Sequence, residues 1–202
     1  MNVALSTYIS LFAGAGGLDL AVGLAIPDAR CVCYVEREAG AARILAARME
    51  DGSMEPAPIW SDVCTFPSEL FRGRVDGIVG GFPCTDLSVA GKQAGIIHGE
   101  HSSLWFEYLR IIREVQPRWV YIENVPAVIA FPAGGIVLGG LTQERFDAEW
   151  LSLRASDVGA PHRRERVFIF AWKRGSELEH ALYGGHEIGR PQSDESVWGG
   201  GR

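Results

Sequence analysis

The feature that most constrains the fold is a short apolar segment, residues 8–12, that runs into a glycine-rich turn and then into a helix-like stretch, residues 18–24. A strand, a glycine turn and a helix in this order form a unit in which backbone N–H groups and a helix N-terminus meet a ligand. A lone glycine-rich turn is weak evidence, because many such turns only reverse the chain. Its position carries more weight, because this turn opens the first β-α unit of the chain.

Strand-like and helix-like segments continue to alternate along the chain. We expect strands at 31–35, 59–61, 75–79 and 119–122, and helices at 39–49 and 104–115. The strand at 119–122 should neighbour the strand at 75–79. After a glycine-rich connection, 131–140, we expect a helix at 141–146 and two strands, 150–153 and 167–172, that pair as a hairpin. The fold class is therefore α/β, with an open, mostly parallel sheet and a C-terminal antiparallel hairpin.

The size of the chain, 202 residues, suits one domain, and 47% hydrophobic with 22% charged residues is typical of a globular protein. We expect this domain at residues 1–173 and a glycine-rich, poorly ordered tail at 174–202. No apolar run has the length of a membrane span, and the amino terminus lacks the basic start of a signal peptide. The sequence therefore predicts a cytoplasmic protein with no membrane partner.

The four cysteines are too few and too scattered for a disulfide framework, and their spacing matches no zinc pattern. We expect reduced thiols and no bound metal. Cys31 and Cys33 lie two apart in a predicted strand, so both should face the same side of the sheet and serve packing.

Two acidic residues end successive predicted strands. Glu36 lies about 20 positions beyond the glycine turn, where a carboxylate is placed to accept hydrogen bonds from ribose hydroxyls. Asp62 ends the next strand. Acids are also common as solvated caps at such ends, but together with the glycine turn they favour a nucleoside pocket.

The predicted strand at 75–79 runs into a loop, residues 80–92, that presents Cys84 beside Pro83. Proline fixes its own φ and the preceding glycines allow close approach of backbone, so the loop suits a thiol nucleophile held in a defined direction. A buried thiol that only fills the core is an equally good interpretation of Cys84 taken alone. The polar, glycine-rich segment that follows, 91–103, is long enough for an active-site loop.

The net charge of -6 argues against a chain that coats nucleic acid by bulk electrostatics. A local basic face is compatible with it, because Arg163, Arg164 and Arg166 cluster between the last two predicted strands. Arginine suits contacts with phosphate or with a base edge.

Taken together, these blocks resemble the C5-type cytosine methyltransferases that modify DNA and use S-adenosylmethionine. The resemblance spans roughly residues 8–173, and its strongest part is a Pro83-Cys84 turn followed by a strand that ends in Glu123-Asn124-Val125. It implies a Rossmann-like sheet of the S-adenosylmethionine-dependent type, with double-stranded DNA as substrate.

The resemblance also implies roles for individual residues. Catalytic roles fall on Cys84, Glu123 and Arg164. Cofactor contacts fall on Phe12, Gly14, Gly16, Gly17, Glu36, Asp62, Pro83 and Leu104. Substrate contacts fall on Ser88, Lys92, Asn124 and Arg166, and Arg110 is a further candidate for phosphate contact.

The chemistry that the resemblance implies is covalent. Cytosine C5 is a weak nucleophile, so the Cys84 thiolate adds to C6 and activates C5 for methylation, while Glu123 holds a proton at N3 and Arg164 contacts the base carbonyl. The cytosine must first be flipped out of the duplex.

Departures from the family pattern leave alternatives open. Thr85 and Asp86 follow the Pro-Cys pair where the family usually has glutamine, and residues 174–202 show neither a target-recognition region nor the closing motifs. A second chain carrying the recognition region is therefore a candidate partner. The alternatives are a non-catalytic cofactor-binding remnant and a methyltransferase that acts on cytosine in RNA.

Overall fold

The computed structural model describes residues 7–84 and 104–176, and in these ranges the chain forms a seven-stranded sheet in the order β3-β2-β1-β4-β5-β7-β6. The strands are β1 (Thr7–Leu11), β2 (Arg30–Val35), β3 (Ile59–Trp60), β4 (Gly77–Gly80), β5 (Trp119–Asn124), β6 (Phe146–Arg154) and β7 (Glu165–Lys173). The first five strands pair in parallel, whereas β7 is antiparallel to both β5 and β6. The predicted fold class is confirmed, including the neighbouring β4 and β5 and the hairpin.

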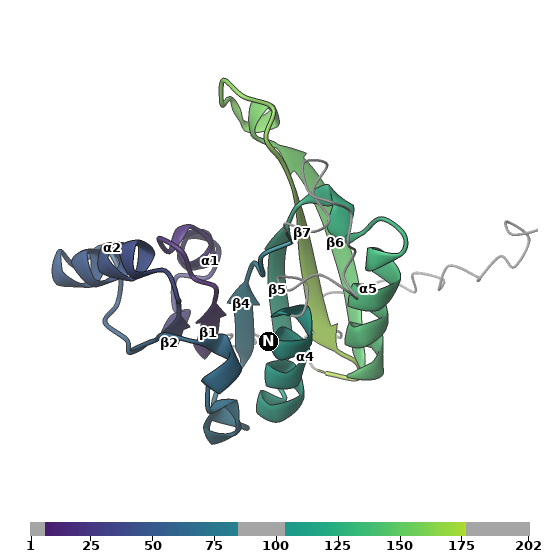
Figure 1. Ribbon diagram of the computed structural model, residues 1–202, viewed down its shortest axis with the longest axis horizontal. Helices are drawn as coiled ribbons and strands as arrows, with labels where there is room; N and C mark the ends of the chain where they lie inside the picture. The colour runs from purple at the N-terminus through teal and green to yellow at the C-terminus, as the bar shows by residue number, and fades with distance from the viewer. Residues whose placement is uncertain (1–6, 85–103, 177–202) are drawn as a thin grey trace, which may run out of the picture.

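Helices cover both faces of the sheet (Figure 1). They are α1 (Gly17–Ala25), α2 (Ala39–Glu50), α4 (Leu104–Val115) and α5 (Ala133–Gln143), with short 3-10 turns at Val63–Thr65, Ser68–Phe71, Pro126–Val128 and Ala155–Val158. Alternate residues of β1 feed two separate apolar cores: Ile9 and Leu11 pack in the core that contains α4 and α5, and Tyr8 packs in the core that contains Val22 of α1. Because both faces of the sheet are buried, the sequences of the strands are nearly continuous apolar runs.

The end of the sheet is asymmetric. The β6–β7 hairpin continues past the carboxyl ends of β4 and β5, because Asn124, the last residue of β5, pairs with Val167 near the start of β7. Figure 1 shows this hairpin projecting beyond the body on the side to which β4 points. The carboxyl edge of the parallel strands is therefore bordered on one side by a raised hairpin.

The predicted helix at 141–146 is wrong. The helix is α5, which begins at Ala133 within the stretch expected to be a glycine-rich connection, and residue 146 already starts β6. Glycine disfavours a helix locally, but burial of Val137 and Leu141 in the core outweighs that preference. Gly140 even serves the packing, because a Cβ there would lie only 3.2 Å from Leu109 and Trp105.

The expectation that Cys31 and Cys33 share one face is also wrong. Cys31 pairs with Tyr8 and Cys33 pairs with Ile9, so one extra residue of β2 forms an irregularity in the ladder. This irregularity places Cys31 in the α1-side core and Cys33 in the α4-side core. Both thiols are buried, so their predicted packing role is confirmed.

Candidate active site at the carboxyl edge of the sheet

The glycine turn after β1 has a backbone that requires glycine. Gly14 and Gly16 have φ of 57° and 77°, in the left-handed region that L side chains rarely adopt. A Cβ at Gly16 would also lie 2.7 Å from the end of the Met54 side chain. Phe12 adopts a φ of 53° without being glycine, which is the kind of backbone strain that clusters at ligand sites.

Glu36 ties the tip of β2 to this turn. Its Oε2 accepts a hydrogen bond from the backbone N–H of Gly14 at 2.7 Å, and its Oε1 accepts one from the N–H of Glu38, also at 2.7 Å. Each carboxylate oxygen can accept more than one hydrogen bond, so both remain able to accept from the two hydroxyls of a ribose.

A cavity of about 570 Å³ lies between the tips of β1, β2 and β3 and the start of α4. Five of the predicted cofactor residues line it: Phe12, Glu36, Asp62, Pro83 and Leu104. Apolar walls with the carboxylates of Glu36, Glu38 and Asp62 suit an adenosine group, whose flat ring has apolar faces and whose ribose hydroxyls and amino group are hydrogen-bond donors.

Asp62 has a local role as well. It caps the 3-10 turn that follows β3, because its Oδ1 accepts from the N–H of Cys64 at 2.9 Å. The capping function predicted as an alternative is therefore present, and it leaves the second carboxylate oxygen available to the cavity.

A second cavity, of about 400 Å³, lies on the other side of Phe12. Gly17, Asp19 and Ser10 line it on the α1 side, and Gly81, Glu123 and Phe168 line it toward β4, β5 and β7. Phe12 and Gly81 line both cavities, so the two lie side by side along the carboxyl edge of the sheet.

Cys84 lies at the end of the described part of the loop after β4. Its side chain is 8% exposed, and all four cysteines lie in the described ranges without forming a disulfide. The buried amide of Asn124 anchors this loop, because its Nδ2 donates to the carbonyl of Phe82 at 3.0 Å. Asn124, predicted as a substrate contact, therefore holds the backbone of the Cys84 loop against the tip of β5.

Glycine is also required where this loop begins. A Cβ at Gly80 would collide with the carbonyl of Leu11, and a Cβ at Gly81 would lie 2.7 Å from the carbonyl and 2.9 Å from the carboxylate of Glu123. The chain can thus pass between the tips of β1 and β5 only because both residues lack a side chain.

The structure pairs Glu123 with Arg166. The Oε1 of Glu123 lies 2.8 Å from the Nε of Arg166, with both side chains about a quarter to a third exposed. Strand register explains the pairing, because Glu123 is opposite Phe168 and Arg166 lies two residues away on the same face. No local sequence signal predicted this pairing, because it depends on the register of two strands that are far apart in the chain.

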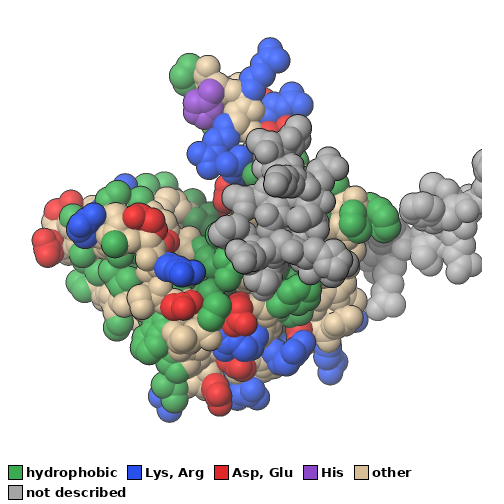
Figure 2. Space-filling view, in the orientation of Figure 1, with side chains coloured by type: hydrophobic (Ala, Val, Ile, Leu, Met, Phe, Trp, Pro, Cys, Tyr) green, Lys and Arg blue, Asp and Glu red, His purple; other side chains and the backbone are tan. Residues whose placement is uncertain are grey.

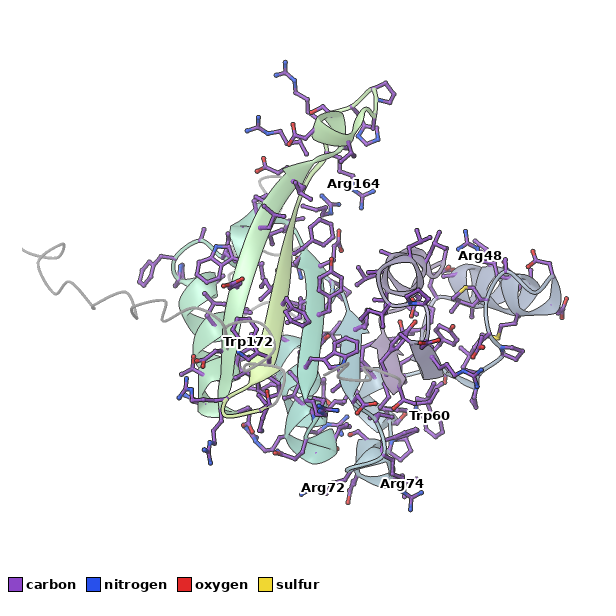
Figure 3. The ribbon with its side chains drawn as sticks, turned by 180° about the vertical axis from the view of Figure 1, so that it is seen from behind. Arg48, Trp60, Arg72, Arg74, Arg164 and Trp172 are labelled. Carbon is purple, nitrogen blue, oxygen red and sulfur yellow. The ribbon has the colours of Figure 1, made fainter. Side chains whose placement is uncertain are left out.

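Arg164 is not brought to Glu123. It lies on the projecting hairpin (Figure 3) and is exposed. Together with Arg166 and Phe168 it lines a depression of about 200 Å³. Within the described ranges, neither Arg163 nor Arg164 has an ion pair or hydrogen bond to another side chain.

Three further candidates do not reach the site in the described residues. Ser88 and Lys92 lie outside those residues. Arg110 is occupied by the fold: it forms ion pairs of 2.7 Å with Glu107 and Glu114, and its guanidinium donates to the carbonyl of Val63 at 2.9 Å. These bonds secure the turn that Asp62 caps, so Arg110 is not free for a phosphate.

Metal-ligating side chains do not gather in the described part of the chain. In residues 7–84 and 104–176, no group of three or more His, Cys, Asp and Glu side chains could hold a metal ion. None of the helices in these ranges is long and apolar enough to cross a membrane.

The fold and the two adjoining cavities define a class of protein, the Rossmann-like methyltransferases of the S-adenosylmethionine-dependent type. The Dnmt2 methyltransferase of S. pombe has the same fold, with a TM-score of 0.66 at 20% sequence identity over 85% of this chain and 50% of that one. The chain also matches the family described as C-5 cytosine-specific DNA methylase over residues 6–196. It belongs to that family.

Curated proteins similar to this chain are named type II methyltransferases. The type II methyltransferase M.CviJI of Paramecium bursaria Chlorella virus IL3A is 31% identical over 175 residues, which cover 86% of this chain and 45% of the relative. M.NgoPII of Neisseria gonorrhoeae is 30% identical over 198 residues, which cover 93% of this chain and 55% of the relative. The chain thus spans about half the length of these relatives.

Proposed function

We propose that the protein transfers a methyl group from S-adenosylmethionine to C5 of cytosine in DNA, with Cys84 as the covalent nucleophile. The observation that carries the proposal is the meeting of three parts at one edge of the sheet. The Cys84 loop leaves β4 through Gly81, which lines both cavities. Gly81 lies so near Glu123 that an added Cβ would be 2.7 Å from its carbonyl.

The residues present fit the cofactor. Glu36 and Asp62 offer carboxylate oxygens to the ribose and the adenine amino group in the 570 Å³ cavity, and Phe12 and Leu104 supply apolar walls. When bound, S-adenosylmethionine supplies an electrophilic methyl group on a sulfonium. The neighbouring cavity beside Glu123 takes the part of the ligand that extends toward the reacting base.

The chain's own groups then act on the cytosine. The Cys84 thiolate forms a bond to C6 and pushes electron density to C5, which becomes able to attack a methyl group. Glu123 holds a proton at N3, where it stabilises the charge that the addition creates, and Arg166 keeps the Glu123 carboxyl oriented. Loss of the C5 proton to a base then breaks the bond from C6 to sulfur and releases Cys84.

The hairpin offers a surface for the duplex. Its tip carries the exposed arginines Arg154, Arg163 and Arg164, on a chain whose net charge is -6. Figure 2 shows Lys and Arg side chains gathered on the projecting part of the molecule. Arginine contacts with phosphate would hold the DNA there without reading its sequence.

Because the chain spans about half the length of its curated relatives, we propose that a second chain carries the region that reads the DNA sequence. The catalytic half would then act on any cytosine that this partner presents.

A trapping experiment tests the mechanism. Duplex DNA containing 5-fluorocytosine cannot lose a proton from C5, so attack by Cys84 leaves a stable adduct after methyl transfer. We expect an adduct in the presence of S-adenosylmethionine, none with Cys84→Ser, and an undiminished adduct with Cys64→Ser, which changes the exposed thiol. An adduct that survives Cys84→Ser would refute the covalent role.

Two further arms of the same experiment separate the alternatives. An adduct with the RNA version and not the DNA version would change the substrate. Calorimetric binding of S-adenosylmethionine without an adduct on either the DNA or the RNA version would identify a cofactor-binding remnant.

A further inference from the structure

Asp19 is a buried carboxyl for which the mechanism above has no use. It lies in the first turn of α1 and is 4% exposed. Its Oδ2 accepts a hydrogen bond from the hydroxyl of Ser10 at 3.0 Å, and Ser10 is itself 1% exposed on β1. Its other oxygen, Oδ1, is buried and has no hydrogen-bond partner among the described residues.

This arrangement costs the fold free energy. Burial raises the pKa of Asp19, and the hydrogen bond from Ser10, which acts in the opposite direction, does not cancel the effect. A position that served packing alone would be better filled by an apolar side chain of similar size. A buried carboxyl with one oxygen that lacks a hydrogen-bond partner therefore indicates a function in the cavity that it lines.

Ser10 and Asp19 lie on either side of the glycine turn in the sequence. Ser10 lies two residues before Phe12, and Asp19 lies two residues after Gly17. The N-cap of α1 is Gly16, which has no side chain to cap the first N–H groups of the helix. The hydrogen bond from Ser10 to Asp19 is thus a side-chain link between the first turn of α1 and β1.

The same two residues form a wall of the 400 Å³ cavity, together with Gly17 and Glu123. If adenosine occupies the larger cavity, the rest of the cofactor must pass Phe12 and Gly81, the two residues that both cavities share. The end that arrives beside α1 is the amino-acid end, whose carboxylate is favoured by an uncapped helix N-terminus.

We propose that Asp19, held by Ser10, is a positioning residue for the amino-acid end of S-adenosylmethionine. It sets the first turn of α1, and with it the backbone of the glycine turn, in the orientation that receives that end. This inference rests on the proposed function, because it assumes the cofactor, but it assigns a role to a pair that the proposed chemistry leaves unused.

Matched ligands test the proposal. Calorimetry measures the Kd of S-adenosylhomocysteine, which has the amino-acid end, and of 5′-methylthioadenosine, which lacks it. We expect Ser10→Ala and Asp19→Ala each to raise the Kd of S-adenosylhomocysteine about tenfold, which is the effect of one lost hydrogen bond to an acid. The Kd of 5′-methylthioadenosine should change by less than about twofold.

Two additional variants sharpen the result. The double variant, Ser10→Ala with Asp19→Ala, should raise the Kd of S-adenosylhomocysteine no more than the more damaging single substitution does, because each substitution removes the same hydrogen bond. Asp19→Asn keeps an acceptor for Ser10 and should bind within about threefold of the unchanged protein. Glu36→Gln is the control, since it should lower the affinity for both ligands.

The outcomes separate this inference from the proposed function. If Ser10→Ala lowered the affinity for both ligands equally, the positioning role would be overturned, because a merely structural change would disturb both cavities. Unchanged binding in both alanine variants would overturn it as well, while the proposed function would stand. If the unchanged protein bound neither ligand, the cofactor assignment itself would fail, and the inference with it.

Discussion

The Nε of Arg166 lies 2.8 Å from Oε1 of Glu123, and this ion pair joins the start of β7 to the tip of β5 beside the Cys84 loop. Arg166→Ala should slow trapping on 5-fluorocytosine DNA about 100-fold, a loss typical of one electrostatic group in an active site. Arg166→Lys should recover part of the rate. Arg164→Ala, measured at saturating DNA, should change the rate less than about threefold; a larger loss there would favour the role first predicted for Arg164.

The exposed tip of the hairpin should govern the salt dependence of DNA binding. Arg163→Ala is expected to weaken binding to any duplex and to reduce the slope of log K against log salt by about 0.9 for each phosphate that the variant no longer neutralises. Fluorescence anisotropy across a salt series measures this slope. Arg48, which lies on α2 in Figure 3, supplies the matched control, and Arg48→Ala should leave the slope unchanged.

Glu36 should determine affinity for the ribose of the cofactor. Glu36→Gln keeps the size of the side chain but weakens the hydrogen bonds from Gly14 and Glu38 and from ribose hydroxyls, so the Kd of S-adenosylmethionine should rise about tenfold. Calorimetry measures the Kd. The comparison is Glu55→Gln, which removes the ion pair with Arg30 at 3.4 Å; a similar loss in that variant would argue against a specific contact.

Gly81→Ala should disturb the site by overpacking. The added Cβ would lie 2.7 Å from the carbonyl of Glu123, so the free energy of unfolding should fall by about 1–3 kcal/mol and trapping should be abolished. Gly135→Ala is the matched control in α5, where a Cβ meets nothing within 4 Å, and it should raise the free energy of unfolding by about 0.5–1 kcal/mol. Urea unfolding measures whether the free energy of unfolding falls in Gly81→Ala and rises in Gly135→Ala.

The buried thiol of Cys33 should make stability fall at high pH. Burial raises its pKa from 9.0 to about 11, so the unfolded chain releases this proton at a lower pH than the folded protein does. The stabilising contribution is complete below pH 9 and is lost as the pH rises toward 11. Urea unfolding from pH 8 to 11 should show a smaller decline for Cys33→Ala; an identical decline would assign the effect to other groups.

Much of the site was accessible from local sequence signals. The glycine turn, the acids at strand tips and the Pro83-Cys84 turn depend on backbone requirements that a few neighbouring residues impose. The predicted residues Phe12, Glu36 and Asp62 accordingly line one cavity. Their roles in binding and catalysis stay predictions that the experiments above test.

The buried pair of Ser10 and Asp19 had a weaker signal. A serine within an apolar strand and an acid in the first turn of the next helix each have common local explanations, so neither points to the other. Only the packing of α1 on β1 shows that both are buried and share a hydrogen bond.

The sequence by itself determined the alternation of strands and helices, the order of the site residues along the chain and the family resemblance, because these depend on local periodicity and residue type. Tertiary structure decided that Glu123 meets Arg166, that Cys31 and Cys33 face opposite cores, and that glycine-rich α5 is a helix. These outcomes depend on strand register and on burial against distant segments, and both are set by free energies that no short stretch of sequence contains.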